Sequence, residues 1–309
     1  MLPLVTIAIP AYKSKYIKIA IDSAIKQTYK NIEIIIVDDS PTDTIKDIVK
    51  EFNDSRIKYF KNTQNLGKEN PAKNWNKCIE YASGDFFSLL CDDDYYEPTF
   101  IEELLNLANK YTATKVFRSR VKIIDEYDNI LNYYPSVPEW ESFYEHIWHM
   151  VNNYRCQTIS EFLYRKTVLE EYGGFSYYPK AWCADRISIY KFSQFGGIAS
   201  TNKILTGFRM SGINISSESS KDIIDKIKAQ ILCTKDISSL ISNIDNKRLI
   251  DTINKKRKIQ ERNIISEYLT NANINDYIYI WKHRKKDFIE INNKTLVKSL
   301  IKRIIRAFL

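Results

Sequence analysis

The sequence predicts an α/β fold in which helices cover both faces of a mainly parallel central sheet, followed by a helical C-terminal region. Over the first hundred residues, short apolar runs alternate with amphipathic stretches. The runs are apolar along nearly their whole length, as expected of parallel strands buried on both faces. After about residue 221, apolar residues recur at helical spacing between charged residues.

The first hundred residues are expected to hold four strands and three helices. The first strand is the β-branched run Val5–Ile9, which we expect to end at Pro10. The remaining elements are expected, in order, as a helix over 16–27, a strand over 32–37, a helix over 44–52, a strand over 56–60, a helix over 69–82 and a strand over 86–90. Between about 115 and 208 this alternation is lost.

The charge of the chain is concentrated near its C-terminus. The 309 residues include 46 Lys and Arg and 38 Asp and Glu, a formal net charge of +8. Residues 282–309 hold nine basic and two acidic residues, a net +7, so the body is nearly neutral. A main domain that binds nucleic acid usually carries a basic face, so this distribution argues against nucleic-acid binding.

The sequence also limits the cellular location. It contains no run of 18 uncharged apolar residues, and its N-terminus lacks the features of a secretory signal. The five cysteines are widely spaced without any C-x-x-C pair, as in a protein whose thiols are reduced. We therefore expect a cytoplasmic protein.

Carboxylates follow two of the four expected strands. Asp38 and Asp39 follow the second strand, and Asp92, Asp93 and Asp94 follow the fourth. Ligands bind beyond the carboxyl ends of parallel strands, and adjacent carboxylates repel one another unless a divalent cation neutralises them. The alternative is a solvated acidic turn, which would be the better interpretation of an isolated Asp-Asp-Asp run. The second acidic strand end reverses that preference.

Several motifs share their order and spacing with one enzyme family. The chain resembles family-2 glycosyltransferases of the GT-A fold, of the type that acts in bacterial surface-polysaccharide synthesis. The resemblance covers about residues 4–215 and rests on these segments: Val5–Tyr12, Gln27–Asp39, Asn65–Gly67, Asn74–Asn76, Leu89–Pro98, Leu163–Lys166, Gly173–Phe175 and Ala184–Arg186.

The resemblance implies how the chain is divided. Residues 1–216 would form the GT-A catalytic domain, with a nucleotide-binding half over 1–100 and an acceptor-side half over 101–216. A boundary near 216–220 would precede a helical C-terminal region over 221–309.

The resemblance also implies a nucleotide site. Asp39 would accept the N3–H of a uracil ring, which selects for uracil or thymine. Asn65 and Gly67 would shape the wall around the base and ribose. The first strand-end loop would line the nucleotide with Pro10, Ala11 and Tyr12.

The aspartate run would be the family's Asp-x-Asp motif, which binds a metal and the sugar nucleotide. Its frequent form is Asp-x-Asp-Asp ahead of a proline, and here Cys91 occupies the first position. Counting back from Pro98, we expect Asp93 to bind Mn²⁺ or Mg²⁺ and Asp92 to bind the ribose or donor sugar. Asp94 would be a supporting or alternative metal ligand, and the division among the three stays open.

Inverting sugar transfer is a single displacement, so a group must accept the proton of the attacking hydroxyl. Asp185 stands at the position of the family's base, shortly after a Gly-Gly-Phe turn. The alternative is that Asp185 caps a helix start, and both roles are compatible.

Other residues are weaker candidates. Trp182, Tyr177 and Tyr178 could stack on sugars, although aromatic residues in core positions are commoner. Arg209 and Ser211 fall where relatives often carry an arginine and a metal- or phosphate-binding histidine, and Arg209 and Trp182 are candidates for contact with the acceptor or donor sugar. His146 and His149 are expected to serve a structural or acceptor-groove role rather than to bind metal.

Two other classes of protein compete with a transferase. A sugar-1-phosphate nucleotidyltransferase would carry a glycine-rich phosphate loop after the first strand, but Pro10–Ser14 contains no glycine. A non-catalytic GT-A-like binding module would usually have lost the acidic motif or the base, and both are present here.

The resemblance implies a nucleoside-diphosphate sugar donor, with UDP favoured, and a glycan acceptor linked to polyprenyl diphosphate, in capsule or O-antigen synthesis. Residues 294–309 alternate apolar and basic residues at helical spacing, as in a helix that lies on an anionic membrane surface. We expect peripheral attachment to the inner face of the cell membrane. The alternative is that this helix packs on its own domain or on a second subunit.

Overall fold

The sheet of the body is mixed, with parallel pairs on both sides of the antiparallel strand β9. The computed structural model describes residues 2–212, 222–242, 245–291 and 293–308, with residues 306–308 described by their backbone alone. Within them, the strand order is β3-β2-β1-β4-β9-β6-β10-β5, with β7 beside β6 and β8 beside β10. Strands β1 to β4 are mutually parallel, whereas β9 runs antiparallel to both β4 and β6. The predicted α/β class is confirmed, and the predicted boundary at 216–220 lies outside the described residues.

The first hundred residues form the four strands and three helices that the sequence predicts, with small shifts at their ends, and they add one short strand that it does not predict. They are β1 (Val5–Ala11), α1 (Ile17–Ile25), β2 (Ile32–Asp38), α2 (Thr44–Lys50), β3 (Ile57–Lys61), α3 (Pro71–Tyr81), β4 (Phe86–Leu89) and the short β5 (Tyr95–Tyr96).

The less regular middle of the chain completes the sheet. It comprises α4 (Phe100–Lys110), β6 (Val116–Ile124), β7 (Ile130–Tyr133), β8 (Trp140–Glu141), α5 (Phe143–Val151), the 3₁₀ turn η1 (Ile159–Glu161), β9 (Phe162–Arg165), α6 (Lys166–Tyr172), the turn η2 (Pro179–Ala181), α7 (Ala184–Ser193) and β10 (Ile198–Arg209).

Strand β1 does not end at Pro10, as the sequence predicted, but continues through it to Ala11. The backbone N–H and C=O groups of the even-numbered residues of β1 point towards β4, as the hydrogen bond from the Leu90 N–H to the Ala8 carbonyl shows. Pairing with β4 stops at Ala8 and Leu89. The backbone nitrogen of Pro10, which carries no hydrogen, therefore faces a side where no strand offers an acceptor. The proline costs the sheet no hydrogen bond.

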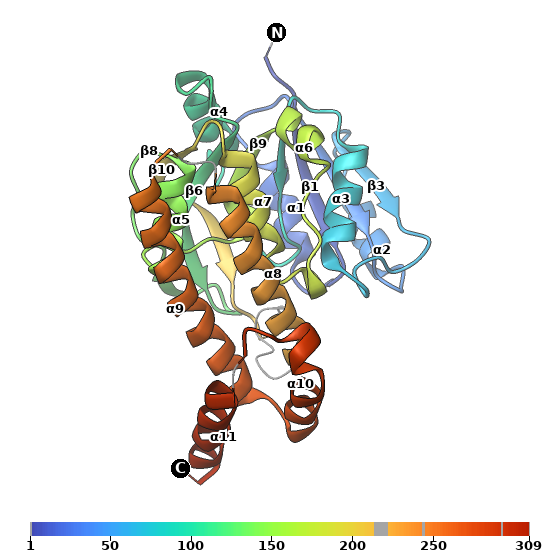
Figure 1. The fold of residues 1–309 in the computed structure, drawn as a ribbon. Coiled ribbons are helices and arrows are strands. Elements are labelled where there is room, and N and C mark those ends of the chain that lie inside the picture. Colours follow the sequence, from blue (N-terminus) through green and yellow to red (C-terminus); the bar gives the residue numbers. More distant parts are fainter. Residues whose placement is uncertain (1, 213–221, 243–244, 292, 309) are drawn as a thin grey trace.

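Helices cover both faces of the sheet, as Figure 1 shows. On one face, α1, α2 and α4 pack on the odd-numbered residues of β1. On the opposite face, α3, α6 and α7 pack on the strand side chains that point to that side. Both clusters consist of fully or nearly fully buried apolar side chains. The strand ends are thereby held at fixed positions, and the loops that follow them carry the predicted site residues.

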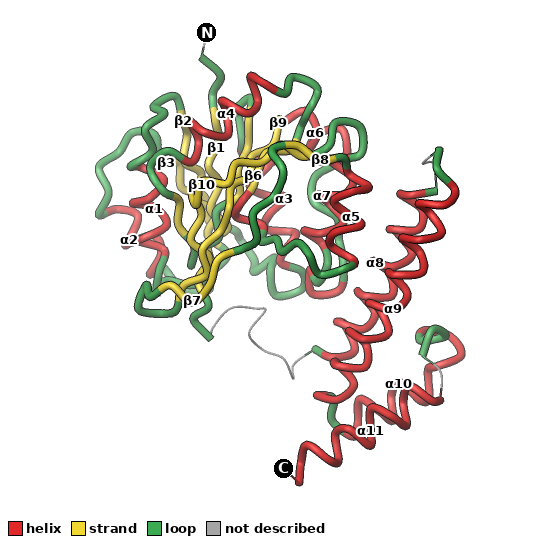
Figure 2. Tube along the Cα trace, turned by 90° about the vertical axis from the view of Figure 1, so that its left-hand side faces the viewer, coloured by secondary structure: helices red, strands yellow, loops and turns green. Residues whose placement is uncertain are grey.

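The C-terminal helices form an appendage beside the sheet (Figures 1 and 2). They are α8 (Ile223–Ile241), α9 (Lys247–Asn271), α10 (Ile274–Asp287) and α11 (Asn293–Phe308). One apolar cluster joins α8 and α9 to α5 and α7 of the body, and a second fills the space among α8 to α11. Among the described helices, none is long and apolar enough to cross a bilayer.

One carboxylate stabilises the centre of the sheet. Glu33 of β2 is buried and accepts hydrogen bonds from the Thr6 hydroxyl, the Ser83 N–H and hydroxyl, and the Lys58 ammonium. Burial alone would favour the neutral acid, but these donors prevail and hold the pKa of Glu33 at about 2.

We expect Glu33→Gln to reduce the free energy of unfolding at neutral pH by about 2 kcal/mol, since the shift corresponds to about 3 kcal/mol and Lys58 is half-exposed to solvent. Because the folded pKa lies below the usual value, this stabilisation is present above about pH 4.5 and is lost as the pH falls towards 2. Urea unfolding of the wild type and of the variant at pH 7 and at about pH 3 measures this change in the free energy of unfolding. A difference in unfolding free energy between the wild type and the variant that is equally large at both pH values would contradict this account.

Candidate active site

Asp92 is bound to the loop that follows β1. Its Oδ2 accepts the backbone N–H groups of Tyr12 and Lys13, at 2.7 and 2.6 Å. Asp92 is buried, which raises its pKa to about 6. Tyr12, by contrast, is 52% exposed. The structure thus brings the predicted Asp92 together with the predicted nucleotide loop Pro10–Tyr12.

Asp39 fixes a second loop. Its two carboxylate oxygens accept the N–H groups of Leu66 and Gly67, at 2.8 and 2.6 Å, and its own N–H donates to the Ala11 carbonyl. A Cβ at Gly67 would lie only 3.0 Å from Asp39 Oδ2, so glycine permits this close approach. Asn65 accepts the Lys68 N–H at 2.7 Å within the same loop. Asp39 therefore joins the β1 and 65–67 loops, and uracil recognition by its carboxylate stays a prediction.

Three groups of the fourth strand end could hold a cation. Ligand atoms of Cys91, Asp93 and Asp94 lie within 4.8 Å of one another. The carboxylates offer the oxygen ligands that Mg²⁺ and Mn²⁺ prefer. Burial raises the pKa of the Cys91 thiol well above its usual value, and sulfur is a soft donor that suits these hard cations poorly. These donors fit a divalent metal bound mainly by Asp93 and Asp94.

Asp94 is the most enclosed of the three aspartates. It accepts the Ser160 hydroxyl at 2.6 Å and the Arg209 N–H at 3.0 Å. Burial, reinforced by the neighbouring Asp93, raises the pKa of Asp94 to about 8. With both of its oxygens already hydrogen-bonded, Asp94 suits the supporting role that the sequence left open.

Arg209 does not lie where the sequence analysis expected a sugar contact. Its side chain is fully buried behind the acidic cluster. The guanidinium donates to the carbonyls of Asp93 and Asp125, both at 3.0 Å, and to the Asp128 carboxylate at 2.7 Å. This corrects the predicted sugar contact: the buried guanidinium of Arg209 holds the backbone of the cluster in place.

Asp185 is the second residue of α7. The residue before the helix is Cys183, in the left-handed region at φ 65°, so Asp185 is not the capping residue itself. Its Oδ2 accepts Gln157 Nε2 at 3.4 Å, and Gln157 Oε1 lies 3.4 Å from His146 Nε2. His146 is fully buried and its Nδ1 lies 2.9 Å from Glu141 Oε1. A chain of polar side chains thus orients Asp185, and it gives His146 the structural role predicted for it.

One short segment connects the two halves of the site. Gln157 contacts Asp185, whereas Ser160 donates to Asp94 and accepts the Cys91 N–H at 3.1 Å. Next to it, Glu161 forms a buried ion pair with Arg118 at 3.0 Å. Residues 157–161 therefore hold the acidic cluster and Asp185 in a fixed relation. Sequence reasoning missed these residues, because they belong to no motif and are separated from their partners by up to 69 positions.

The aromatic candidates separate into different environments. Trp182 is half-buried, with the Lys226 ammonium of α8 at 4.5 Å from its ring centroid. Tyr177 is 58% exposed, but Tyr178 is buried and its hydroxyl donates to Asp236 of α8. The sugar-stacking prediction is therefore wrong for Tyr178, which is a core residue, and stays open for Trp182 and Tyr177. Ser211 lies two residues beyond the end of β10.

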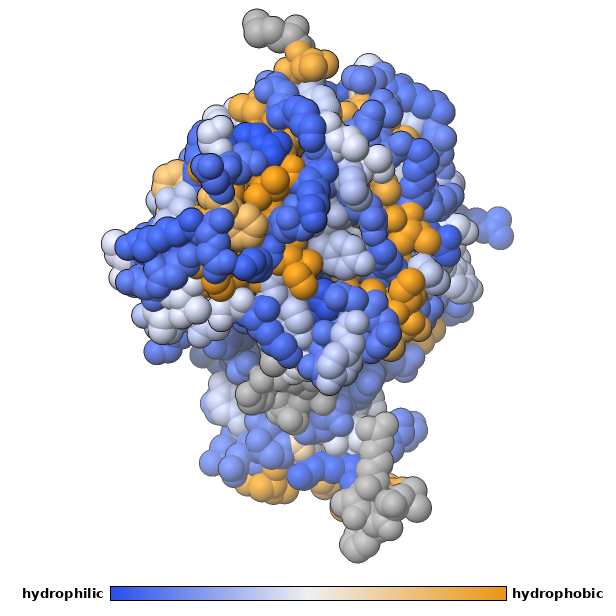
Figure 3. All heavy atoms as spheres, turned by 180° about the vertical axis from the view of Figure 1, so that it is seen from behind, coloured by the Kyte–Doolittle hydropathy of each residue, from blue (hydrophilic) through white to orange (hydrophobic). Residues whose placement is uncertain are grey.

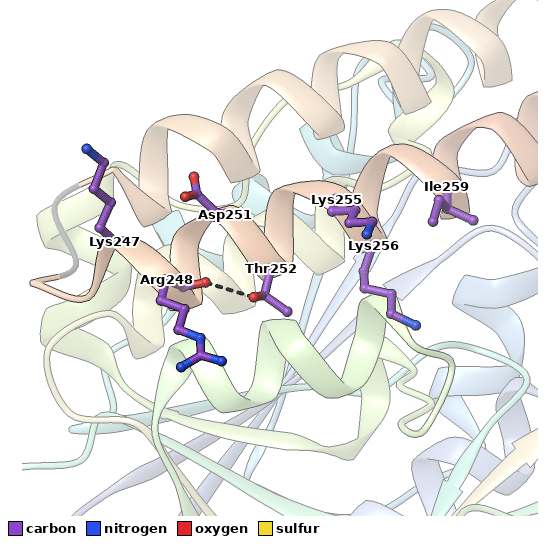
Figure 4. Close-up of a pocket in the computed structure, with 7 residues that line it drawn as sticks. All are labelled: Lys247, Arg248, Asp251, Thr252, Lys255, Lys256 and Ile259. Atoms are coloured by element: carbon purple, nitrogen blue, oxygen red, sulfur yellow. Dashed lines mark hydrogen bonds between the residues drawn. The ribbon is translucent and has the colours of Figure 1, made fainter.

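A separate surface hollow of about 750 Å³ lies along α9. Figure 4 shows its lining, which comes from one helix: Lys247, Arg248, Asp251, Thr252, Lys255, Lys256 and Ile259. The dashed bond is donated by the Thr252 hydroxyl to the Arg248 carbonyl within the helix. No lining residue belongs to the strand-end loops, so this basic hollow is not part of the candidate active site.

A family model described as glycosyl transferase family 2 matches residues 6–177, more than half of the chain. The chain belongs to this family. An uncharacterised glycosyltransferase of Rickettsia typhi is 41% identical over 109 residues, which are 35% of this chain and 33% of that protein. The Escherichia coli enzyme WfaP, named a UDP-Glc:alpha-D-GlcNAc-diphosphoundecaprenol beta-1,3-glucosyltransferase, is 38% identical over 138 residues, 44% of this chain and 53% of WfaP. The chain thus spans about a third to a half of the length of these relatives.

Solved structures extend the likeness to the fold of nearly the whole chain. S. aureus TarS in complex with UDP-GlcNAc matches 96% of this chain and 79% of its own, with a TM-score of 0.62 and 17% identity. The mannosyltransferase PcManGT of Pyrobaculum calidifontis, in complex with GDP-Man and Mn²⁺, matches 98% and 87%, with a TM-score of 0.57 and 12% identity. These similarities confirm the predicted GT-A fold.

Proposed function

We propose that this chain is an inverting, metal-dependent glycosyltransferase that moves a sugar from a UDP-sugar to a hydroxyl of a lipid-linked glycan. The observation that carries the proposal is the arrangement of carboxylates at the strand ends. Asp92 and Asp39 hold the two loops predicted to surround a nucleotide, and Asp93 and Asp94 offer oxygen ligands beside them.

The acidic cluster accounts for the leaving group. A divalent cation, when bound, supplies charge that stabilises the diphosphate as it departs. Asp93 would hold the cation and Asp94 would support it, while Ser160 and Arg209 keep Asp94 in place from behind. The backbone N–H groups of Tyr12 and Lys13 keep Asp92 at the mouth of the β1 loop, where it could meet the ribose or donor sugar.

Asp185 would act as the base. It accepts the proton of the acceptor hydroxyl as that oxygen attacks the anomeric carbon. The bond from this carbon to the diphosphate oxygen breaks in the same step, which inverts the configuration. Gln157 donates to the carboxylate and fixes its direction before the acceptor arrives, and such positioning is a major part of enzymatic rate enhancement.

The relatives support the choice of substrates. The name of WfaP states a UDP-glucose donor and a diphosphoundecaprenol-linked acceptor, and TarS was solved with UDP-GlcNAc. A lipid-linked acceptor of this chemistry would place the enzyme in O-antigen or capsule synthesis. PcManGT was solved with GDP-Man and Mn²⁺, which supports a nucleoside-diphosphate sugar with a divalent cation.

We expect Asp185→Asn to lower sugar transfer by about 10²- to 10⁴-fold, because the amide cannot accept the hydroxyl proton. The measurement is release of nucleoside diphosphate from a panel of UDP-sugars with Mn²⁺, for variants whose thermal unfolding matches the wild type. Asp251→Asn, on the exposed face of α9, is the matched control and should retain full activity. Near wild-type transfer by a folded Asp185→Asn variant would remove Asp185 as the base.

The helical appendage would bring the enzyme to its lipid-linked acceptor. On α11, Leu296 and Leu300 pack inward, but Val297, Ile301, Ile304 and Ile305 are about half-exposed. They share one face, beside which lie the exposed lysines Lys294, Lys298 and Lys302. One face of this helix therefore packs on its own domain, and the other face, which is apolar with a basic border, supports the proposal of membrane attachment.

Helix α10 adds a second apolar stripe of the same kind. Ile274, Ile278 and Trp281 recur at helical spacing and are exposed, Trp281 to 65%. Lys282 and Lys285 lie beside them. Figure 3 shows apolar surface at the lower end of the appendage among hydrophilic residues. Apolar side chains bordered by cations suit the interface of an anionic membrane, where each basic residue contributes about 1 kcal/mol.

We expect the double variant Ile301→Glu and Ile304→Glu to bind vesicles of phosphatidylglycerol and phosphatidylcholine at least about tenfold more weakly than the wild type, since it places charge in the apolar face. Co-sedimentation measures the binding. Leu131→Glu on β7, a similarly exposed apolar position of the body, is the control. Equal binding by the double variant and the control would contradict membrane attachment through α11.

A further inference from the structure

The acidic cluster already contains a cation of the protein itself. The Lys13 ammonium forms a hydrogen-bonded ion pair with Asp93 and lies 3.5 Å from Asp92 Oδ1. Both carboxylates are about 5% exposed, whereas the lysine side chain is 24% exposed. The ammonium therefore approaches the cluster from the solvent side. Although burial works against its charge, the two aspartates raise the pKa of Lys13, so it stays protonated.

The ammonium occupies the carboxylate that the metal is expected to use. Asp93 is the aspartate assigned to the metal, and Lys13 donates directly to its Oδ2. A divalent cation and an ammonium cannot share that oxygen, because two positive charges in contact repel each other strongly inside a protein. Binding of a metal at Asp93 Oδ2 therefore requires the ammonium to leave that oxygen.

The lysine side chain can leave without disturbing its loop. The backbone N–H of Lys13 donates to Asp92 Oδ2 at 2.6 Å, next to the bond from Tyr12. These two bonds hold the loop independently of the side chain. The lysine stem is flexible, and its ammonium is a compact charge that serves well as a phosphate ligand. The displaced ammonium thus lies on the loop predicted to line the nucleotide.

We propose that Lys13 is an internal counterion that neutralises Asp93 in the empty site and transfers to the diphosphate of the donor when a divalent metal takes its place. The inference rests on the proposed function, because it takes a nucleoside diphosphate and a metal as the ligands. Metal alone binds weakly, since it must displace the ammonium from Asp93 while no diphosphate is present to receive that charge. Metal and nucleotide bind cooperatively, because the diphosphate receives the released charge.

The exchange gives Lys13 a positioning role that differs from a fixed phosphate ligand. A fixed ligand would strengthen nucleotide binding alone and leave the metal unaffected. An exchanging counterion weakens metal binding in the absence of nucleotide and strengthens the mutual effect of the two ligands. By linkage, the factor by which UDP tightens Mn²⁺ equals the factor by which Mn²⁺ tightens UDP.

The test is Mn²⁺ binding followed by electron paramagnetic resonance of free Mn²⁺, with and without UDP, at one pH. We expect Lys13→Met to bind Mn²⁺ alone about tenfold more tightly than the wild type and to show a smaller enhancement by UDP. Lys13→Arg retains the charge and should bind Mn²⁺ alone as weakly as the wild type. Lys18→Met, which removes an exposed lysine of α1 paired with Glu51, is the control and should bind as the wild type does.

Unchanged or weaker binding of Mn²⁺ alone by Lys13→Met would overturn the proposal, and Lys13→Gln repeats the test if the methionine variant does not fold. The outcome is separate from that of the proposed function. If the wild type binds neither UDP nor Mn²⁺, the assignment of the site fails as a whole. If it binds both and Lys13→Met alters neither the affinity for Mn²⁺ nor the enhancement by UDP, only the exchange is refuted.

Discussion

The structure depends on holding several carboxylates together, nearly out of solvent, at the ends of β2 and β4. Like charges in such a place are stable only with counter-charges and hydrogen-bond donors around them. The protein supplies backbone N–H groups to Asp92 and Asp39, a hydroxyl and an N–H to Asp94, and an ammonium to Asp93. These donors come from the loop after β1, the 65–67 loop, the turn η1 and the end of β10. The carboxylates therefore fix the positions of these segments, and the donors on these segments in turn keep the carboxylates together.

This constraint explains why the irregular half of the chain is placed as it is. The segment 157–161 bonds to the acidic cluster at one end and to Asp185 at the other. Helix α8 of the appendage then packs on the loop before α7, through Lys226 on Trp182 and Asp236 on Tyr178. The helical appendage is thus joined to the loop before α7, which is predicted to lie on the acceptor side, and a surface that attached the appendage to a membrane would also orient the site.

The sequence predicted the first half of the fold well, because buried parallel strands and amphipathic helices have strong local patterns. It failed at Pro10, since the effect of a proline depends on whether a neighbouring strand is present at that position. The acidic residues and Asp185 could be chosen from their motifs. The roles of Arg209 and Tyr178 could not be predicted, because each depends on a hydrogen bond to a residue far away in the sequence. Gln157, Ser160 and Lys13 carry no signal of their own, and their contacts exist only once the loops meet.

The most direct test of the central claim is a calorimetric titration of UDP into the wild type and into Asp93→Asn, each with and without Mn²⁺. The account predicts that Mn²⁺ tightens UDP binding to the wild type by at least about tenfold and has no such effect on the variant. UDP binding of equal strength with and without Mn²⁺ in both proteins, or none in either, would contradict the claim that these carboxylates form a metal and nucleotide site.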